Sequence, residues 1–160
     1  MTDNQLSKET VVKQVRNADW VMLTSTGADG KLVSHPMTPQ EVTDDADVWF
    51  LTSTAVSQAE ALRKSNHVNI AVSETGSWLS VAATVEFVDD QAKIDELWND
   101  DMKAYFSGRH DPTLGLLRAT SESAQSWGLT GGKIENLFEI AKSRVTGDKT
   151  DSGGTGTAEL

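Results

Sequence analysis

The sequence predicts an α+β domain in which mostly antiparallel strands form a barrel surrounded by peripheral helices. Three observations support this prediction. Short strand-like segments follow one another closely along the first half of the chain, an Asp-Gly turn joins the first two, and amphipathic helical segments lie between and around them. A chain of 160 residues with 38% hydrophobic and 24% charged residues has the composition of a single globular domain.

The first half of the chain contains most of the predicted elements. Apolar residues spaced along one face predict a helix over residues 7–17. Pro36 and Pro39 have no backbone N–H, so the strand that they interrupt is expected at a sheet edge. Ser53 or Thr54 is expected to cap a helix that follows the third strand. The strands predicted in this half cover residues 20–26, 31–37, 48–52, 68–73 and 78–88.

The second half alternates between helix, loop and strand. Asp89 or Asp90 is expected to cap a helix, and residues 114–120 and 125–129 are predicted to form two separate strands. An amphipathic pattern over residues 134–145 predicts a last helix. The helix after the acidic cap is expected to contain Ile94, Leu97, Trp98 and Met102.

The end of the chain differs from the rest in composition. Residues 148–159 contain no large apolar side chain and are rich in Gly, Thr and Asp. They cannot contribute to a core and are predicted to be flexible unless a partner orders them. We therefore expect one domain over residues 1–147 and a flexible tail over residues 148–160.

Charge and composition exclude several classes of function. A formal net charge of −10 argues against nucleic acid and anionic membranes as partners, because both require clustered Lys and Arg. The chain has no cysteine, and His35, His67 and His110 lack metal-ligand spacing, so no metal site is expected. The first ten residues lack the apolar core of a signal peptide, and no run approaches ~20 apolar residues, which favours a cytoplasmic protein.

Two features suggest a ligand site. Residues 49–54 form a strand-to-helix junction rich in hydroxyl groups, and the N–H groups at a helix N-terminus can bind a phosphate monoester. From the residues alone, ordinary helix capping by Ser53 or Thr54 is the favoured interpretation of this junction. A flat aromatic ligand could stack on a tryptophan, although most tryptophans are core or interface residues. The five tryptophans are Trp20, Trp49, Trp78, Trp98 and Trp127.

A colinear series of segments resembles the pyridoxamine 5′-phosphate oxidase-like flavoproteins, in particular the general stress protein 26 subgroup. No single segment is specific, but their order extends over nearly the whole chain. The segments are residues 22–25 (MLTS), 33–37 (VSHPM), 49–53 (WFLTS), 60–62 (EAL), 68–72 (VNIAV), 79–81 (LSV), 89–90 (DD), 93–94 (KI), 96–98 (ELW), Trp127 and 138–147.

This resemblance implies a split β-barrel homodimer with two flavin mononucleotides (FMN) at its interface. The expected contacts of the isoalloxazine ring are Ser34, His35, Pro36 and Met37, with Trp78 facing the ring. The residues expected near the ribityl chain and phosphate are Leu51, Thr52, Ser53, Ser57 and Gln58. Trp98, Phe106 and Trp127 are expected to reach the flavin from the partner subunit or the rim, or else to pack in the dimer interface.

The sequence departs from the family in two places. Many relatives carry an Arg-Lys pair where this chain has Ser57-Gln58, so weaker FMN binding is expected, unless Arg63 or Lys64 compensates. Flavin adenine dinucleotide (FAD) is an alternative if the phosphate end is open. The chain also lacks the basic C-terminal segment of true pyridoxamine phosphate oxidases, which argues against that activity.

The sequence leaves three functions open. The first is a flavin-dependent oxidoreductase of unknown substrate, in which the cofactor performs the chemistry. The second is a flavin carrier without turnover, and the third is a cofactor-free dimer. A deazaflavin-type cofactor also remains open, whereas no histidine stands out as a haem ligand.

Overall fold

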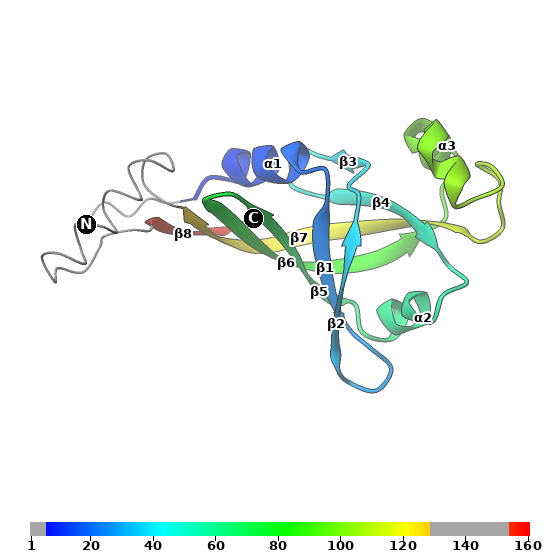
Figure 1. The fold of residues 1–160 in the computed structure, drawn as a ribbon, viewed down its shortest axis with the longest axis horizontal. Coiled ribbons are helices and arrows are strands. Elements are labelled where there is room, and N and C mark those ends of the chain that lie inside the picture. Colours follow the sequence, from blue (N-terminus) through cyan, green and yellow to red (C-terminus); the bar gives the residue numbers. More distant parts are fainter. Residues whose placement is uncertain (1–5, 129–153) are drawn as a thin grey trace, which may run out of the picture.

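The computed structural model describes residues 6–128 and 154–160 (Figure 1). The helices and strands follow one another in chain order, and η1 denotes a 3₁₀ helix. They are α1 (Lys8–Asn17), β1 (Val21–Thr26), β2 (Leu32–Met37), β3 (Glu41–Val42), β4 (Val48–Ser53), α2 (Ser57–Lys64), β5 (His67–Glu74), β6 (Ser77–Val88), α3 (Gln91–Leu97), η1 (Asp100–Ala104), β7 (Leu114–Gly128) and β8 (Gly154–Glu159).

All eight described strands belong to one antiparallel sheet. The order is β2-β1-β5-β6-β7-β4-β3, and β8 also pairs with β7. The long strand β7 pairs with β4 through residues 114–119 and with β8 through residues 123–128, so the sheet divides along β7. The described sheet does not close on itself. The predicted α+β class with mostly antiparallel strands is confirmed, and the open sheet is that of a split barrel.

The main core lies on the inner face of this sheet. Helix α1 contributes Val11, Val12 and Val15, which are buried with Leu23 and Ile70 of the strands. The N-terminus of α1 is capped by Ser7, whose hydroxyl accepts a hydrogen bond from Thr10 N–H at 3.2 Å. A second, smaller cluster lies beneath α3. Its buried members are Leu51, Ile94, Phe106, Leu114 and Leu116.

Most predicted elements are confirmed, with four differences. Strand β3 was not predicted. The two strands predicted over residues 114–120 and 125–129 form the single strand β7, which has a register shift opposite Ala82 and Ala83. The helix capped by Asp90 ends before Trp98, and η1 follows it. The N-cap of α2 is Val56, so neither Ser53 nor Thr54 caps that helix.

The predicted flexible tail is wrong for residues 154–160. Strand β8 pairs with β7, and Leu160 N–H donates to the Glu122 carbonyl at 2.9 Å. Ala158 and Leu160 pack against the main core. Sequence patterning missed this strand because backbone hydrogen bonds to a neighbouring strand need no large apolar side chains. The helix predicted over residues 134–145 and the tail residues 148–153 lie outside the described residues.

Candidate functional site

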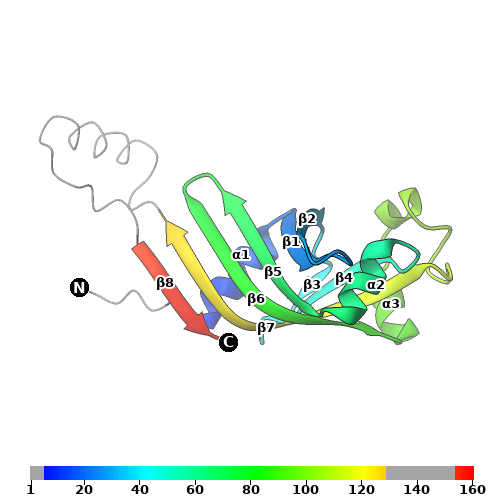
Figure 2. The ribbon, with the colours of Figure 1, turned by 90° about the horizontal axis from the view of Figure 1, so that it is seen from below.

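The outer face of the sheet carries exposed tryptophans. Trp78 of β6 and Trp127 of β7 are direct register partners, and each is 40% exposed. Strand alternation places Trp20 and Met22 of the β1 segment on this outer face as well, and both are exposed. Figure 2 shows β5, β6 and β7 side by side, with α1 crossing them on the inner side. The outer face therefore offers aromatic surface without a covering helix in the described part of the chain.

Polar side chains lie on the same outer face. Thr24 Oγ1 and Ser34 Oγ are 2.6 Å apart, and Asn69 Nδ2 donates to Ser80 Oγ at 2.7 Å. Thr24 is the register partner of both Ser34 and Asn69, so these groups form a strip across β2, β1, β5 and β6. The face thus combines aromatic surface with hydrogen-bonding groups, which suits a flat ligand with a polar edge.

Residues 34–37, which were predicted to line the isoalloxazine ring, lie on edge strand β2, but their side chains point to the two opposite faces of the sheet. Ser34 and Pro36 are on the outer face. His35 is the partner of fully buried Leu23, and Met37 packs against the main core. The prediction that the proline-containing strand lies at a sheet edge is confirmed, because β2 ends the strand order.

A contact between β2 and α2 brings together two predicted site residues 23 positions apart in the chain. The Gln58 amide nitrogen lies 2.9 Å from His35 Nδ1 and also contacts His35 Nε2. The donor and acceptor roles in this contact depend on the tautomer of the His35 ring. Burial lowers the pKa of His35 below its ordinary value, which favours the neutral imidazole.

The start of α2 has no side-chain cap. Its N-cap residue, Val56, makes no side-chain hydrogen bond. Ser53 Oγ accepts instead from Ala55 N–H at 3.2 Å, and Thr54 Oγ1 donates to the Thr113 carbonyl at 3.2 Å. The capping interpretation of this junction is therefore wrong. The Ala59 N–H donates to the Val56 carbonyl at 3.0 Å, whereas the N–H groups of Ser57 and Gln58 meet no side-chain acceptor among the described residues and can receive an anion.

The other predicted residues of this junction have different environments. Leu51 is buried in the small cluster beneath α3, so its side chain serves packing. Thr52 is partly exposed, and Ser57 is exposed at the first position of α2. Among the predicted phosphate-binding residues, Thr52, Ser53, Ser57 and Gln58 thus reach the surface around the start of α2.

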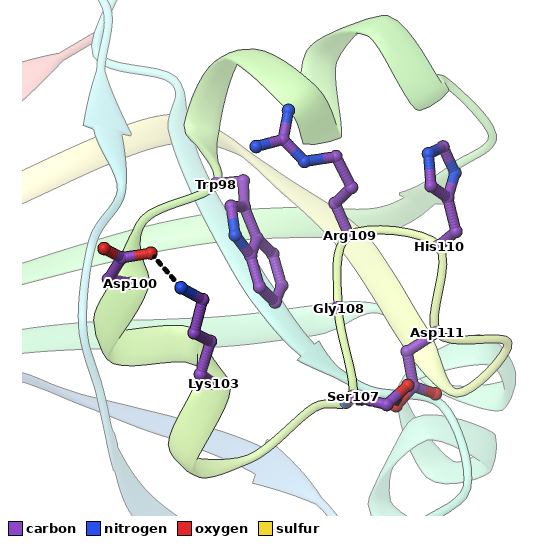
Figure 3. Close-up of a pocket in the computed structure, with 8 residues that line it drawn as sticks. All are labelled: Trp98, Asp100, Lys103, Ser107, Gly108, Arg109, His110 and Asp111. Atoms are coloured by element: carbon purple, nitrogen blue, oxygen red, sulfur yellow. Dashed lines mark hydrogen bonds and ion pairs between the residues drawn. The ribbon is translucent and has the colours of Figure 1, made fainter.

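The lobe formed by α3, η1 and the following loop contains an open pocket of about 550 Å³ (Figure 3). Trp98, which was predicted to reach a flavin from the partner subunit or to pack in the dimer interface, lines this pocket. Phe106 does not, because it is buried within the small cluster of its own chain, and the predicted flavin contact finds no support there. The pocket is lined by Trp98, Asp100, Lys103, Ser107, Gly108, Arg109, His110 and Asp111.

Both acidic residues of the pocket make hydrogen bonds, Asp100 with Lys103 and Asp111 with Ser107 and Thr113. Lys103 Nζ is 2.7 Å from Asp100, and this hydrogen bond is the main cause that lowers the pKa of Asp100. Backbone hydrogen bonds from Ser107 and Thr113 hold the pKa of Asp111 far below its ordinary range. Of the residues that line the pocket, only Trp98 was predicted from the sequence as a site residue, because the basic residues of this loop have no recognisable motif.

The predicted site residues fall into separate groups within one chain. Trp127 pairs with Thr155 of β8, and β8 lies at the opposite end of the molecule from α2 and α3 (Figure 1). His35 and Gln58 lie at the α2 end. Trp49, one of the possible stacking platforms, already has two cations near its ring, because Lys93 Nζ and Arg118 Cζ are 5.5 and 5.6 Å from the ring centroid. One chain therefore does not assemble all the predicted residues around one ligand.

The fold places the chain among the α+β proteins with an antiparallel split barrel. The sequence profile of the family described as pyridoxamine 5′-phosphate oxidase like matches residues 7–151. The chain belongs to this family. No curated protein matches the chain. No described helix is long and apolar enough to cross a membrane.

Solved structures of general stress proteins are similar along most of their length. A general stress FMN/FAD binding protein from Xanthomonas citri is 31% identical, with a TM-score of 0.64, over 79% of this chain and 97% of that one. A protein from Jannaschia sp. CCS1, described as a general stress protein 26, is 27% identical, with a TM-score of 0.72, over 94% and 96%. A protein related to general stress protein 26 from Clostridium acetobutylicum is 22% identical, with a TM-score of 0.67, over 77% and 91%.

Proposed function

We propose that this protein binds flavin, as FMN with FAD as the alternative, and acts as a flavin-dependent oxidoreductase of the general stress protein 26 type. The observation that carries the proposal is the uncapped start of α2 beside the His35–Gln58 contact. The backbone N–H groups of Ser57 and Gln58, together with their side chains, can hold a phosphate monoester on a chain that is otherwise acidic. The name of the Xanthomonas citri relative supports the same ligand.

The flavin ring would lie on the outer face near β2. Ser34 and Thr24 offer hydroxyl groups there, and backbone groups of an edge strand remain free to meet the polar rim of the ring. When bound, the flavin supplies hydride or electron transfer. The protein binds and orients the ring, and its residues tune the ring through hydrogen bonds.

A homodimer completes this site. Trp78 and Trp127 lie far from α2 within one chain, but a second copy placed on the outer face brings its own tryptophans toward the first chain. Large aromatic residues with 40% of their surface exposed are typical of interface anchors. The dimer interface would therefore hold two flavins, as the family resemblance implies.

A flavin carrier without turnover is the second candidate. The neutral pair Ser57-Gln58 favours this candidate, because it would hold the phosphate without a fixed positive charge. The contact between His35 and Gln58 also favours it. The two functions differ in one property, the steady reduction and reoxidation of the bound flavin.

An absorbance spectrum after addition of FMN and dialysis tests the proposal. We expect a retained yellow band with about one flavin per chain and quenched flavin fluorescence. Bound flavin that NADH or NADPH reduces, and that an acceptor reoxidises over many cycles, supports the oxidoreductase. Bound flavin that resists every such reductant supports the carrier. A colourless protein after dialysis would contradict both and leave a cofactor-free dimer.

A further inference from the structure

The polar strip on the outer face, formed by Ser34, Thr24, Asn69 and Ser80, leaves three hydrogen-bonding groups free. Thr24 Oγ1 and Ser34 Oγ share one hydrogen bond of 2.6 Å, so whichever hydroxyl donates, the O–H of the other remains a free donor. Asn69 Nδ2 donates to Ser80 Oγ at 2.7 Å, which leaves the Asn69 carbonyl oxygen as an acceptor and the Ser80 O–H as a donor. These four side chains make no other hydrogen bond within the described part of the chain.

The three free groups follow one another across the sheet as donor, acceptor and donor. Thr24 on β1 is the register partner of Ser34 on β2 and of Asn69 on β5. Ser80 lies on β6, which pairs with β5 on its other side (Figure 2). Neighbouring strands are roughly 4.8 Å apart, so the groups are adjacent on one face, with the Asn69 oxygen between the two hydroxyl donors.

Small side chains surround the strip and leave room for a flat ligand. Ala82 is the register partner of Asn69, and Ala71 is the register partner of both Ser80 and Met22. Both alanines are partly exposed on the outer face. A planar group can therefore approach Asn69 and Ser80 without displacing a large side chain.

The strip is also electrically neutral. Strands β1 and β2 contain no Lys, Arg, Asp or Glu, and Glu86, farther along the outer face of β6, is paired with Arg118. A phosphate or carboxylate group presents acceptors alone, and one of them would meet the Asn69 oxygen. The strip therefore favours an uncharged edge in which one N–H lies between two carbonyl groups.

The flavin ring has such an edge. Its imide consists of C2=O, N3–H and C4=O, which present an acceptor, a donor and an acceptor in that order. This order is the complement of the donor, acceptor and donor on the sheet. A buried polar site that matches each group of its ligand discriminates strongly against an analogue that lacks one of them.

We propose that this polar strip recognises the imide edge of the flavin ring, with the Asn69 oxygen accepting from N3–H and the flanking hydroxyls donating to the two carbonyl groups. This inference rests on the proposed flavin site. It adds Asn69 and Ser80 to that site and gives Thr24 the role of orienting the Ser34 hydroxyl. A deazaflavin has the same imide edge, so the strip selects the imide and not the atom at position 5.

Comparison of FMN with 3-methyl-FMN tests this inference. The two ligands share the ring system, the ribityl chain and the phosphate, but the methyl group replaces the hydrogen on N3. Dissociation constants for both are measured by flavin fluorescence quenching with the wild-type protein and the Asn69→Ala variant. Asn66→Ala is the matched control, because Asn66 is exposed immediately before β5 and lies off the strip.

We expect the wild-type protein to bind FMN roughly tenfold more tightly than 3-methyl-FMN, because the methyl group removes a hydrogen bond and leaves the Asn69 oxygen unpaired. In Asn69→Ala this preference should fall below about threefold, since the acceptor is gone. Asn66→Ala should keep the wild-type preference.

Ser80→Ala is a second variant with a different expected signature. It removes a donor to a carbonyl group that both ligands have, so both should bind about fivefold more weakly. This variant also tests the strip if Asn69→Ala does not fold. Unchanged affinity of Ser80→Ala for both ligands would overturn the inference.

The outcomes separate this inference from the proposed function. If the wild type binds FMN and 3-methyl-FMN equally well, or if Asn69→Ala keeps the full preference, imide recognition by the strip is overturned while the flavin site stands. If neither ligand binds the wild type, the proposed function fails and this inference fails with it. If Asn66→Ala loses the preference as Asn69→Ala does, the effect is not specific to the strip and the inference is overturned.

Discussion

At the residue scale, Gly115 sets how closely β7 approaches the segment between β4 and α2. A Cβ at this position would lie 2.5 Å from Thr54 Cγ2 and 3.1 Å from Phe87 Cε1. Thr54 is held by its hydrogen bonds to the Thr113 carbonyl and cannot retreat easily. We expect Gly115→Ala to reduce the free energy of unfolding by about 1–3 kcal/mol because of this overpacking.

Chemical denaturation followed by tryptophan fluorescence measures the effect of Gly115→Ala. Gly108→Ala is the matched control, because a Cβ at Gly108 would meet no heavy atom within 4 Å. Equal stability of the two variants would show that the chain around Thr54 can shift without a loss of stability. The close approach at Gly115 would then not determine the position of the junction before α2.

Asp111 is the residue through which the loop next to α3 responds to pH. Its carboxylate accepts hydrogen bonds from Ser107 N–H at 2.9 Å and from Thr113 N–H at 2.8 Å, and these bonds lower its pKa in the folded state. A group with a depressed folded-state pKa stabilises the fold above its unfolded-state pKa, and this contribution is lost as the pH falls. We expect Asp111→Asn to be less stable than wild type at pH 7, and the difference to shrink toward pH 3.

Urea unfolding at pH 7, 5 and 3 measures this difference. Asp101→Asn serves as the control, since Asp101 is exposed and its carboxylate has no hydrogen bond or ion pair within the described part of the chain. The interpretation is wrong if the difference between Asp111→Asn and wild type stays constant over this pH range.

At the element scale, β8 shows how side-chain alternation ties the end of the chain to the sheet. Ala158 pairs with buried Ala124 and faces the core, whereas Thr157 pairs with Gln125 on the exposed side. We expect Ala158→Asp to reduce the free energy of unfolding by about 1–3 kcal/mol, because it places a charged group against the core. Thr157→Asp should change stability by less than about 0.5 kcal/mol.

Thermal unfolding and hydrogen exchange of the β7 amides measure the two variants at β8. Faster exchange over residues 123–128 in Ala158→Asp alone is the expected signature, because those residues pair with β8. Similar exchange in both variants would mean that the orientation of β8 on the sheet does not matter for its pairing.

The elements also show where sequence patterning succeeds and where it ends. Hairpin turns and alternation identified β1, β2, β4, β5 and β6, since these signals are local. The prediction divided β7 in two because the polar residues between Thr120 and Gln125 interrupt its apolar pattern. Pairing with β6 from Leu116 to Gly128 keeps this polar stretch extended. Such pairing is a tertiary effect that no local pattern encodes.

At the scale of the whole molecule, the candidate site was predicted as a set of residues rather than as a geometry. The resemblance indicated both β2 and α2, but not that His35 and Gln58 touch each other. It also did not reveal that Phe106 is buried in its own chain, because η1 and the loop after it fold back onto Leu114 and Leu116. Contacts of this kind depend on how distant segments pack, which residue spacing does not specify.

Because Trp78 and Trp127 lie far from α2 within one chain, the proposed flavin site depends on whether two chains form a dimer. If a second copy covers the outer face, Trp78→Ala removes an interface anchor of the kind that contributes ~2 kcal/mol or more, and the dimer dissociation constant should rise at least roughly 30-fold. FMN binding should weaken in parallel, because each proposed site would then require both chains. Sedimentation equilibrium and flavin titration of the same samples measure the two effects together.

Tyr105→Ala is the matched control for Trp78→Ala, because Tyr105 is an aromatic residue with 76% exposure on the lobe at the other end of the molecule. We expect this variant to remain a dimer and to bind FMN as the wild type does. A monomeric Trp78→Ala protein that binds FMN with unchanged affinity would contradict the shared site, since one chain would then hold the flavin alone. Dissociation caused by Tyr105→Ala and not by Trp78→Ala would place the interface on the α3 lobe instead of the outer sheet face.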